Sequence, residues 1–244
     1  MFDSKRWVTA SFGLALVFLA AQVAMASEVT IFPSKDNTLF QHDEGTLSSG
    51  AGSHLFVGNS DSGTSRRALI TFDIAAHIPE GATINRVKLT LNMSGSSEQT
   101  ADLTLHRVLA DWGEGTSAPS GQEDRGSAAT EGDATWIHTF FATRTWNIPG
   151  GDFAEVPSAS REVGGRGSYS WAAPEMASDV QAWLDHPSSN FGWMMLGVEG
   201  SNPSAKRFDS RENGEEVNRP VLEVHFDLTA VEARSWGRIK LEGR

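Results

Sequence analysis

Residues 83–93, TINRVKLTLNM, carry the clearest structural pattern in this chain. From Val87 to Met93, apolar side chains stand at every second position, which is typical of a β-strand with one buried face. Ile84 is out of step with Val87, and this slip predicts either a β-bulge or a later start of the strand. The stretch therefore predicts a long strand that lines one side of a hydrophobic core.

Shorter runs with the same alternation occur on both sides of this strand, bounded by Gly, Ser, Asn and Pro. We predict further strands at residues 28–33, 54–58, 66–73, 102–109, 191–199, 205–210 and 220–228. Residues 173–186 instead have apolar side chains at helical spacing, with Pro174 in the first turn, and predict a short helix. Many short strands with a single helix indicate an all-β sandwich.

Residues 112–167 separate two groups of these strands and are rich in Gly, Ser, Asp and Glu. A segment of this length without secondary structure is unusual in a compact domain, and this one contains too many tryptophans and phenylalanines for a disordered linker. We expect short strands near residues 135–141 and 169–172, joined by long surface loops.

The first residues, 1–26, have the layout of a secretory signal peptide. Lys5 and Arg6 provide the positive start, an apolar run extends over residues 12–23, and residues 24–26 form a small-x-small cleavage site. The apolar run is shorter than the roughly 20 residues that a membrane-spanning helix needs. The pattern predicts cleavage of this segment and export of the rest of the chain.

The remaining sequence predicts one secreted, extracellular domain at residues 27–229 and a locally basic tail at residues 230–244. It contains no cysteine, so its core has to be stable without disulfides. The whole chain has 31 acidic and 20 basic residues and a formal net charge of −11. Nucleic acids and anionic membranes both need a cationic surface, so we expect neither as a partner, and no later stretch is apolar enough to span a membrane.

Several phrases of the sequence together resemble one known family. They are LFVGNSDSGTSRRALITFDI at residues 55–74, IPEGATI at 78–84, GDATW at 132–136 and AKRFDSRE at 205–212. The chain is similar in these phrases to DNRLRE-domain proteins, which are close to a class of bacterial carbohydrate-binding modules. The resemblance covers about residues 29–226. It implies a jelly-roll β-sandwich, an extracellular setting and a non-catalytic module that binds a polysaccharide or a cell-surface glycan.

Two tryptophans, Trp112 and Trp146, lie in or beside the long loops and are the predicted stacking surfaces for a sugar. The flat face of an indole can cover the apolar face of a sugar ring. The alternative is that these side chains fix the loops to the sandwich. Trp171, Trp183 and Trp193 fall on the inward faces of predicted elements, so we expect them in the core.

Basic side chains are notable in so acidic a chain, and Arg67, Arg207 and Arg211 are the predicted ligand-binding ones. A guanidinium group can hold the carboxylate of a uronic acid through two parallel hydrogen bonds. The alternative is a network of ion pairs with nearby acids, since Asp209 and Glu212 lie next to these arginines in sequence.

Acidic residues in glycine-rich turns suggest bound calcium, with Asp133, Asp152 and Glu114 as the predicted metal ligands. Calcium takes six to eight oxygen ligands, and an exported protein meets it readily. Asp36 also stands among these acidic candidates. The alternative is that the aspartates accept hydrogen bonds from backbone N–H groups of their own turns.

An enzymatic role stays open, although no residue pattern assigns one. A polysaccharide lyase needs a base and a cation, and Tyr169 is the single tyrosine of the chain. A glycosidase needs two paired carboxylates, which the sequence alone cannot pair. We therefore expect a secreted glycan-binding domain with structural calcium. The alternatives are an extracellular structural or adhesive surface protein and, third, a lyase or hydrolase.

Overall fold

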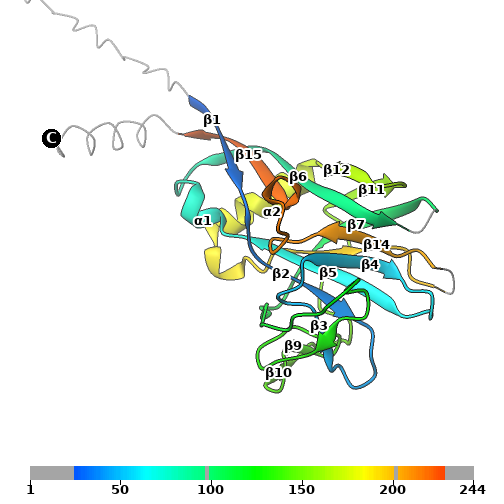
Figure 1. The fold of residues 1–244 in the computed structure, drawn as a ribbon. Helices are drawn as coiled ribbons and strands as arrows, with labels where there is room; N and C mark the ends of the chain where they lie inside the picture. Colours follow the sequence, from blue (N-terminus) through cyan, green and yellow to red (C-terminus); the bar gives the residue numbers. More distant parts are fainter. Residues whose placement is uncertain (1–24, 97–98, 201–202, 229–244) are drawn as a thin grey trace, which may run out of the picture.

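The computed structural model describes residues 25–96, 99–200 and 203–228 (Figure 1). Strands dominate this part of the chain, and their pairings are antiparallel. The predicted fold class, an all-β jelly-roll sandwich with long loops and a short helix, is confirmed. Most of the predicted signal peptide and the whole predicted tail at residues 230–244 lie outside the described residues.

Two layers of strands form the sandwich. The first layer contains β1 (Met25–Ile31), β15 (Val221–Leu228), β6 (Thr83–Ser96), β12 (Gly167–Trp171), β14 (Lys206–Asp209) and β4 (His54–Asn59). The second layer contains β2 (Pro33–Phe40), β5 (Ser65–Phe72), β13 (Trp193–Leu196), β7 (Ala101–Arg107) and β11 (Ala159–Val163). Because β4 also pairs with β5 at its last two residues, the layers join into one curled sheet of 11 strands.

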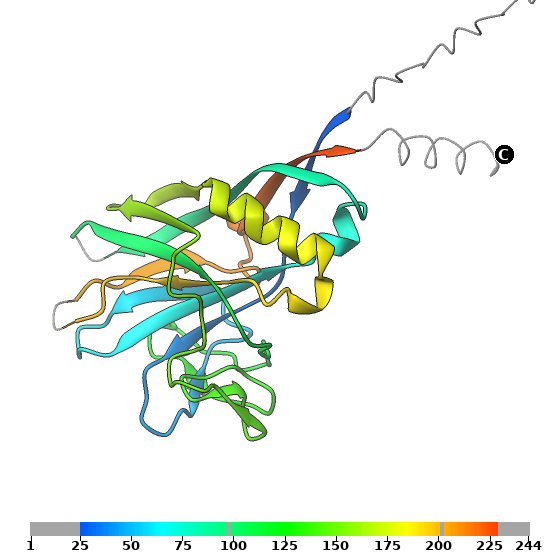
Figure 2. The ribbon, with the colours of Figure 1, turned by 180° about the vertical axis from the view of Figure 1, so that it is seen from behind.

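Smaller elements complete the fold. They are α1 (Ile74–His77), α2 (Pro174–Asp185), the 3₁₀ helices η1 (Pro187–Ser189) and η2 (Glu216–Asn218), and the short strand pairs β3 (Leu47–Ser48) with β8 (Ser127–Ala128) and β9 (His138–Phe140) with β10 (Arg144–Thr145). Figure 2, which views the molecule from behind, shows α2 lying across the sandwich. The helix predicted at residues 173–186 is therefore confirmed.

The central strand β6 has the bulge that the slip in its sequence predicts. His225 of β15 pairs with Arg86 and Phe226 pairs with Ile84, so Asn85 is the extra residue. The N–H of Ile84 is satisfied instead by the side-chain oxygen of Gln181 on α2, at 2.9 Å. The bulge thus fixes the position of the helix on the sandwich.

The main core lies between the two layers and beneath α2. The side chains of β6 that alternate inward are almost fully buried, as are the three tryptophans predicted for the core: Val87, Leu89, Leu91, Met93, Trp171, Trp183 and Trp193. Trp183 of α2 and Trp193 of β13 meet edge to face with ring centroids 4.6 Å apart. Such contacts between large rings contribute to the stability of a core that contains no cysteine.

A second core lies on the outer side of the second layer, under a long excursion of the chain at residues 111–153 (Figure 1). It packs Trp112, Trp136 and Trp146 from the excursion against Leu39 of β2 and Met194 of β13. Strands β2 and β5 are consequently buried on both faces.

Candidate functional site

The two tryptophans predicted to bind sugar are both buried in this second core. Trp112 is 1% exposed and Trp146 is 4% exposed. The indole N–H of Trp112 donates to the carbonyl of Phe191, and that of Trp146 donates to the carbonyl of Thr135, both at 2.9 Å. Their burial contradicts the prediction that a sugar stacks on these rings. They instead fix the excursion to the sandwich, as the alternative interpretation predicts.

Two of the three predicted metal ligands hold turns of the backbone instead. Asp133 accepts hydrogen bonds from the N–H and hydroxyl of Thr130 at 2.6 and 3.2 Å. Asp152 accepts from the N–H groups of Asn147 and Ile148 at 2.9 and 3.1 Å. Short aspartate side chains commonly stabilise turns in this way. The structure thus corrects the predicted set, of which Glu114 alone remains.

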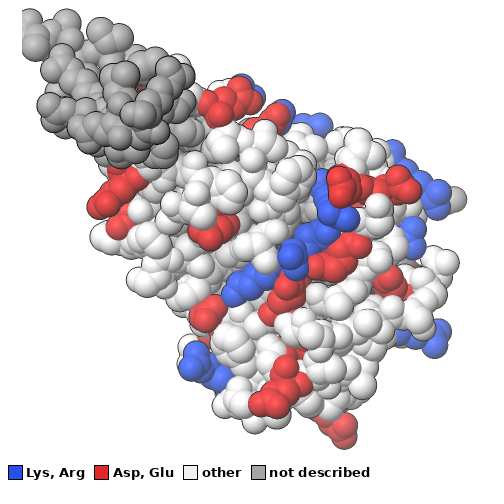
Figure 3. All heavy atoms as spheres, turned by 60° about the vertical axis from the view of Figure 1, so that its left-hand side comes forward, with Lys and Arg blue, Asp and Glu red and all other residues white. Residues whose placement is uncertain are grey.

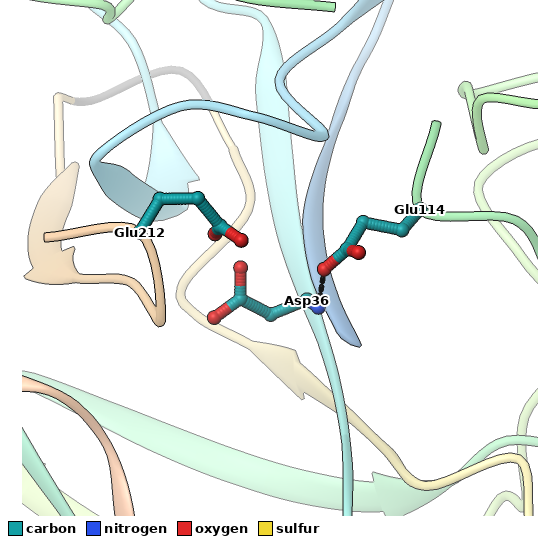
Figure 4. A group of neighbouring side chains, drawn as sticks. All are labelled: Asp36, Glu114 and Glu212. Carbon is teal, nitrogen blue, oxygen red and sulfur yellow. Dashed lines mark hydrogen bonds between the residues drawn. The ribbon is translucent and has the colours of Figure 1, made fainter. Parts of the chain in front are cut away.

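Glu114 belongs to a different acidic group, formed with Asp36 and Glu212. Asp36 lies on β2, Glu114 at the start of the excursion and Glu212 in the turn after β14. One carboxylate oxygen from each lies within 4.8 Å of the others, and Figure 4 shows the three side chains converging. Among the described residues, this is the group of metal-ligating side chains that lies close enough together to hold a metal ion.

Two oxygens of this group are buried without a hydrogen-bond donor, namely Oδ1 of Asp36 and Oε2 of Glu212. Asp36 is 1% exposed, and its carboxylate points toward that of Glu212 (Figure 4). Burial raises the pKa of Asp36 well above its ordinary value, and the negative charges of Glu212 and Glu114 act in the same direction. A buried carboxylate oxygen without a donor is costly, so the arrangement calls for a positive group between these oxygens.

Arg211 supplies part of the positive charge. Its Nη1 donates to both oxygens of Glu114 at 3.0 Å and to Oε1 of Glu212 at 2.7 Å, while its backbone N–H donates to Oδ2 of Asp36 at 2.8 Å. Burial lowers the pKa of Arg211, but the carboxylates of Glu114 and Glu212 outweigh burial and raise it overall. When all three acids are ionised, the group keeps two negative charges, which a divalent cation would neutralise.

Arg211 is thus engaged in this ion-pair network, and Arg67 is engaged in another, while their role as glycan ligands stays a prediction. Arg67 forms a bidentate ion pair with Glu199, at 2.7 and 2.8 Å, and donates to the carbonyl of Gly150 at 2.7 Å. Its guanidinium also lies 4.8 Å from the ring centre of Trp136. Both arginines are engaged by the protein itself, as the ion-pair alternative predicts.

Arg207 lies in a different environment, in an open groove of about 560 Å³. The groove runs between β4, β14, the chain after β2 and the loop at residues 121–126. Its charged lining residues are Arg66, Arg125, Lys206, Arg207, Asp61 and Asp124, and its uncharged polar ones include Gln41, Ser60, Ser62 and Thr64. Four of these lining residues are basic and two are acidic, but the side chain of Lys206 is fully buried and donates to the hydroxyl of Ser96 and the carbonyl of Gln99.

The two central arginines of the groove donate to neutral oxygens. Arg66 donates from Nε to the backbone carbonyl of Asp124 at 2.9 Å, and Arg207 donates to the side-chain oxygen of Gln122 at 3.1 Å and to the hydroxyl of Ser94 at 3.3 Å. Within the described part of the chain, no carboxylate lies within ion-pair distance of either guanidinium. Burial lowers the pKa of Arg66, and the nearby charges of Asp124 and Asp61 act against that shift.

Some other surface charges are paired. Lys35 pairs with Asp111 at 3.0 Å, and Lys88 pairs with Glu223. On the face shown in Figure 3, a band of basic side chains has acidic side chains alongside it. The lack of an acidic partner is not confined to the groove, because the exposed Arg161 and Arg166 form no ion pair with a described residue either.

The hydroxyl of the single tyrosine, Tyr169, donates to the carbonyl of Gly165 at 2.7 Å and accepts from the N–H of Gly164 at 3.1 Å. These contacts close a turn between β11 and β12 and give it a structural role. None of the helices in the described residues has the length and apolar character needed to cross a membrane.

Comparison with known proteins does not name a family. No protein-family model matches the chain, and a search of curated proteins finds no similar sequence. The resemblance to DNRLRE-domain proteins stays a prediction. The class that fold and geometry define is an all-β sandwich with a buried acidic group able to hold a metal ion and a separate basic groove.

Proposed function

We propose that this protein is a secreted, non-catalytic domain that binds an acidic glycan in the groove around Arg66 and Arg207. The observation that carries the proposal is the guanidinium of Arg207, which is half-buried in the groove and donates only to neutral oxygens. Arg66 also donates to a neutral oxygen but is only 7% exposed, so an acidic group of a ligand would gain its charge-assisted bond mainly at Arg207.

The polar lining suits a sugar in other respects. Hydroxyl groups of Ser60, Ser62 and Thr64 lie along the same groove and can exchange hydrogen bonds with sugar hydroxyls. Phe40 and Phe56 also line it but are 3% and 4% exposed, so they offer little stacking surface. The affinity would therefore come mainly from charge, and would fall as salt rises.

Affinity measurements with a panel of acidic and neutral oligosaccharides test this function. We expect binding of the acidic members only, with an affinity about tenfold lower in Arg207→Gln, since a bond to a charged group contributes about 1.5–3 kcal/mol. The matched control is Arg161→Gln, because Arg161 is exposed on β11 and lies outside the groove. Equal losses in both variants, or no binding of any acidic sugar, would remove the proposal.

Calcium is the cation that we propose for Asp36, Glu114 and Glu212. All three provide hard oxygen ligands, and two oxygens bound to one calcium ion lie up to about 5 Å apart. The 4.8 Å limit on their separation is therefore compatible with such an ion. Water and backbone carbonyls would complete the six to eight ligands that calcium takes. A rise in the unfolding temperature with calcium, lost in Glu114→Gln, is the expected result, and an unchanged temperature contradicts it.

A further inference from the structure

We infer that a cation held by Asp36, Glu114 and Glu212 raises the affinity of the groove for its acidic ligand. The inference rests on the glycan-binding function proposed above. Its basis is that two segments of the chain contribute to both sites. One segment is β14 with the turn that follows it, and the other is the excursion at residues 111–153.

The first shared segment carries Arg207 in the groove and Glu212 in the acidic group. The turn between them is held firmly, because the N–H and hydroxyl of Ser210 donate to the carbonyls of Ser53 and Gly52 at 3.0 and 2.7 Å. The N–H of Glu212 in turn donates to the hydroxyl of Ser210 at 3.1 Å. Because this turn is held firmly, the positions of Glu212 and Arg207 are linked through it.

The second shared segment provides Glu114 to the acidic group and one wall of the groove. That wall is the loop at residues 121–126, which accepts from Arg207 through Gln122 and from Arg66 through the carbonyl of Asp124. Between these two contacts, the carboxylate of Glu123 lies 3.0 Å from Nδ1 of His54 on β4. The loop thus places the acceptors that orient both arginines.

The acidic group links these two segments through β2. The N–H of Asp36 donates to Glu114 at 2.8 Å, and the side chain of Asn37 donates to the carbonyl of Glu114 at 2.9 Å. The carboxylates of Asp36 and Glu212 face each other (Figure 4), each has one oxygen without a donor, and their like charges repel when both are ionised. A cation between them replaces this repulsion by attraction and draws β14, β2 and the excursion together.

The loop that forms the groove wall contains three residues in the left-handed region of backbone conformation. Gly121, Glu123 and Gly126 all have positive φ, at 70°, 61° and 65°. Glu123 is not a glycine, so this conformation costs energy that the contact with His54 offsets. The contact between Glu123 and His54 therefore helps to hold the loop in this conformation.

Isothermal titration of the full mature chain with an acidic oligosaccharide, in calcium and in EDTA at equal ionic strength, tests the coupling. We expect an affinity at least about fivefold higher in calcium, the low end of ordinary coupling between sites. By linkage, the oligosaccharide should raise the affinity for calcium by the same factor, which a calcium titration with and without the sugar measures.

Glu212→Gln and Asp36→Asn separate this coupling from direct bridging of the sugar by calcium. Circular dichroism checks that each variant is folded, and each should bind the sugar equally in calcium and in EDTA. A dependence on calcium that persists in both variants overturns the inference. An equal affinity of the parent protein with and without calcium also overturns it but leaves the glycan-binding function standing. Absence of sugar binding in either condition refutes both.

Discussion

Replacement of Arg211 by glutamine is the sharpest test of the charge balance at the acidic group. The variant keeps three converging carboxylates and loses the guanidinium that donates to Glu114 and Glu212 at 3.0, 3.0 and 2.7 Å. A hydrogen bond to a charged group contributes about 1.5–3 kcal/mol when buried. The Arg211 side chain is 34% exposed, so solvent screening reduces this contribution, and we expect a loss of about 2 kcal/mol in the absence of metal.

For a domain of this size, a loss of about 2 kcal/mol lowers the unfolding temperature by roughly 4–8 °C. Thermal unfolding in EDTA, followed by circular dichroism, measures the shift. Arg161→Gln removes an equal charge from an exposed position on β11 and should change the free energy of unfolding by less than about 0.5 kcal/mol. Calcium should stabilise Arg211→Gln more than the parent, because the ion replaces the missing positive charge.

Two results would refute this reasoning. If Arg211→Gln unfolds in EDTA at the temperature of the parent, the three carboxylates do not need the arginine as a counter-charge. If saturating calcium stabilises the parent but not the variant, Arg211 is required to build the site and does not share its carboxylates with the ion.

Three further substitutions separate structural from ligand-binding roles. Trp146→Phe removes the donor to the buried carbonyl of Thr135 and should lower the free energy of unfolding in urea by about 1–3 kcal/mol, while the affinity for glycan stays unchanged. A loss of glycan binding without a loss of stability would instead support the stacking role. Arg67→Gln breaks the ion pair with Glu199 and should lower the free energy of unfolding in urea without lowering the affinity for glycan. Gly192→Ala should destabilise by more than about 2 kcal/mol, because φ is +74° and a Cβ would lie 2.1 Å from the carbonyl of Ile70; a folded variant of parental stability contradicts this.

The sequence predicts those strands that have one face on the main core. Strand β6 and its bulge are examples, because their side chains alternate between core and solvent. Strand β2 has no such pattern, since Asp36, Asn37 and Thr38 are all buried. Its polar residues are accommodated by the excursion, where Asn37 donates to Ser48 at 3.0 Å and to the carbonyl of Glu114 at 2.9 Å. Contacts that depend on a loop so distant in sequence leave no periodic signal.

The candidate site is less accessible to sequence reasoning than the fold. Glu114 is found because its residue type and glycine-rich surroundings suit calcium, but Asp36 and Glu212 meet it only after the strands have paired. The position of a tryptophan in a long loop likewise does not tell whether its ring faces solvent or folds back. Trp112 and Trp146 fold back because the outer face of the second layer is apolar at Leu39 and needs covering.

The pairing of β1 with β15 has a consequence for how the protein acquires its shape. Ile31 of β1 pairs with Leu222 of β15, so the first strand of the described sandwich has the last one as its neighbour. Until that neighbour arrives, the apolar side of β1 has nothing to cover it, and contacts so remote along the chain form slowly. Folding of the domain is therefore expected to be a late, concerted event, in which the chain stays vulnerable to aggregation until β1 and β15 have paired.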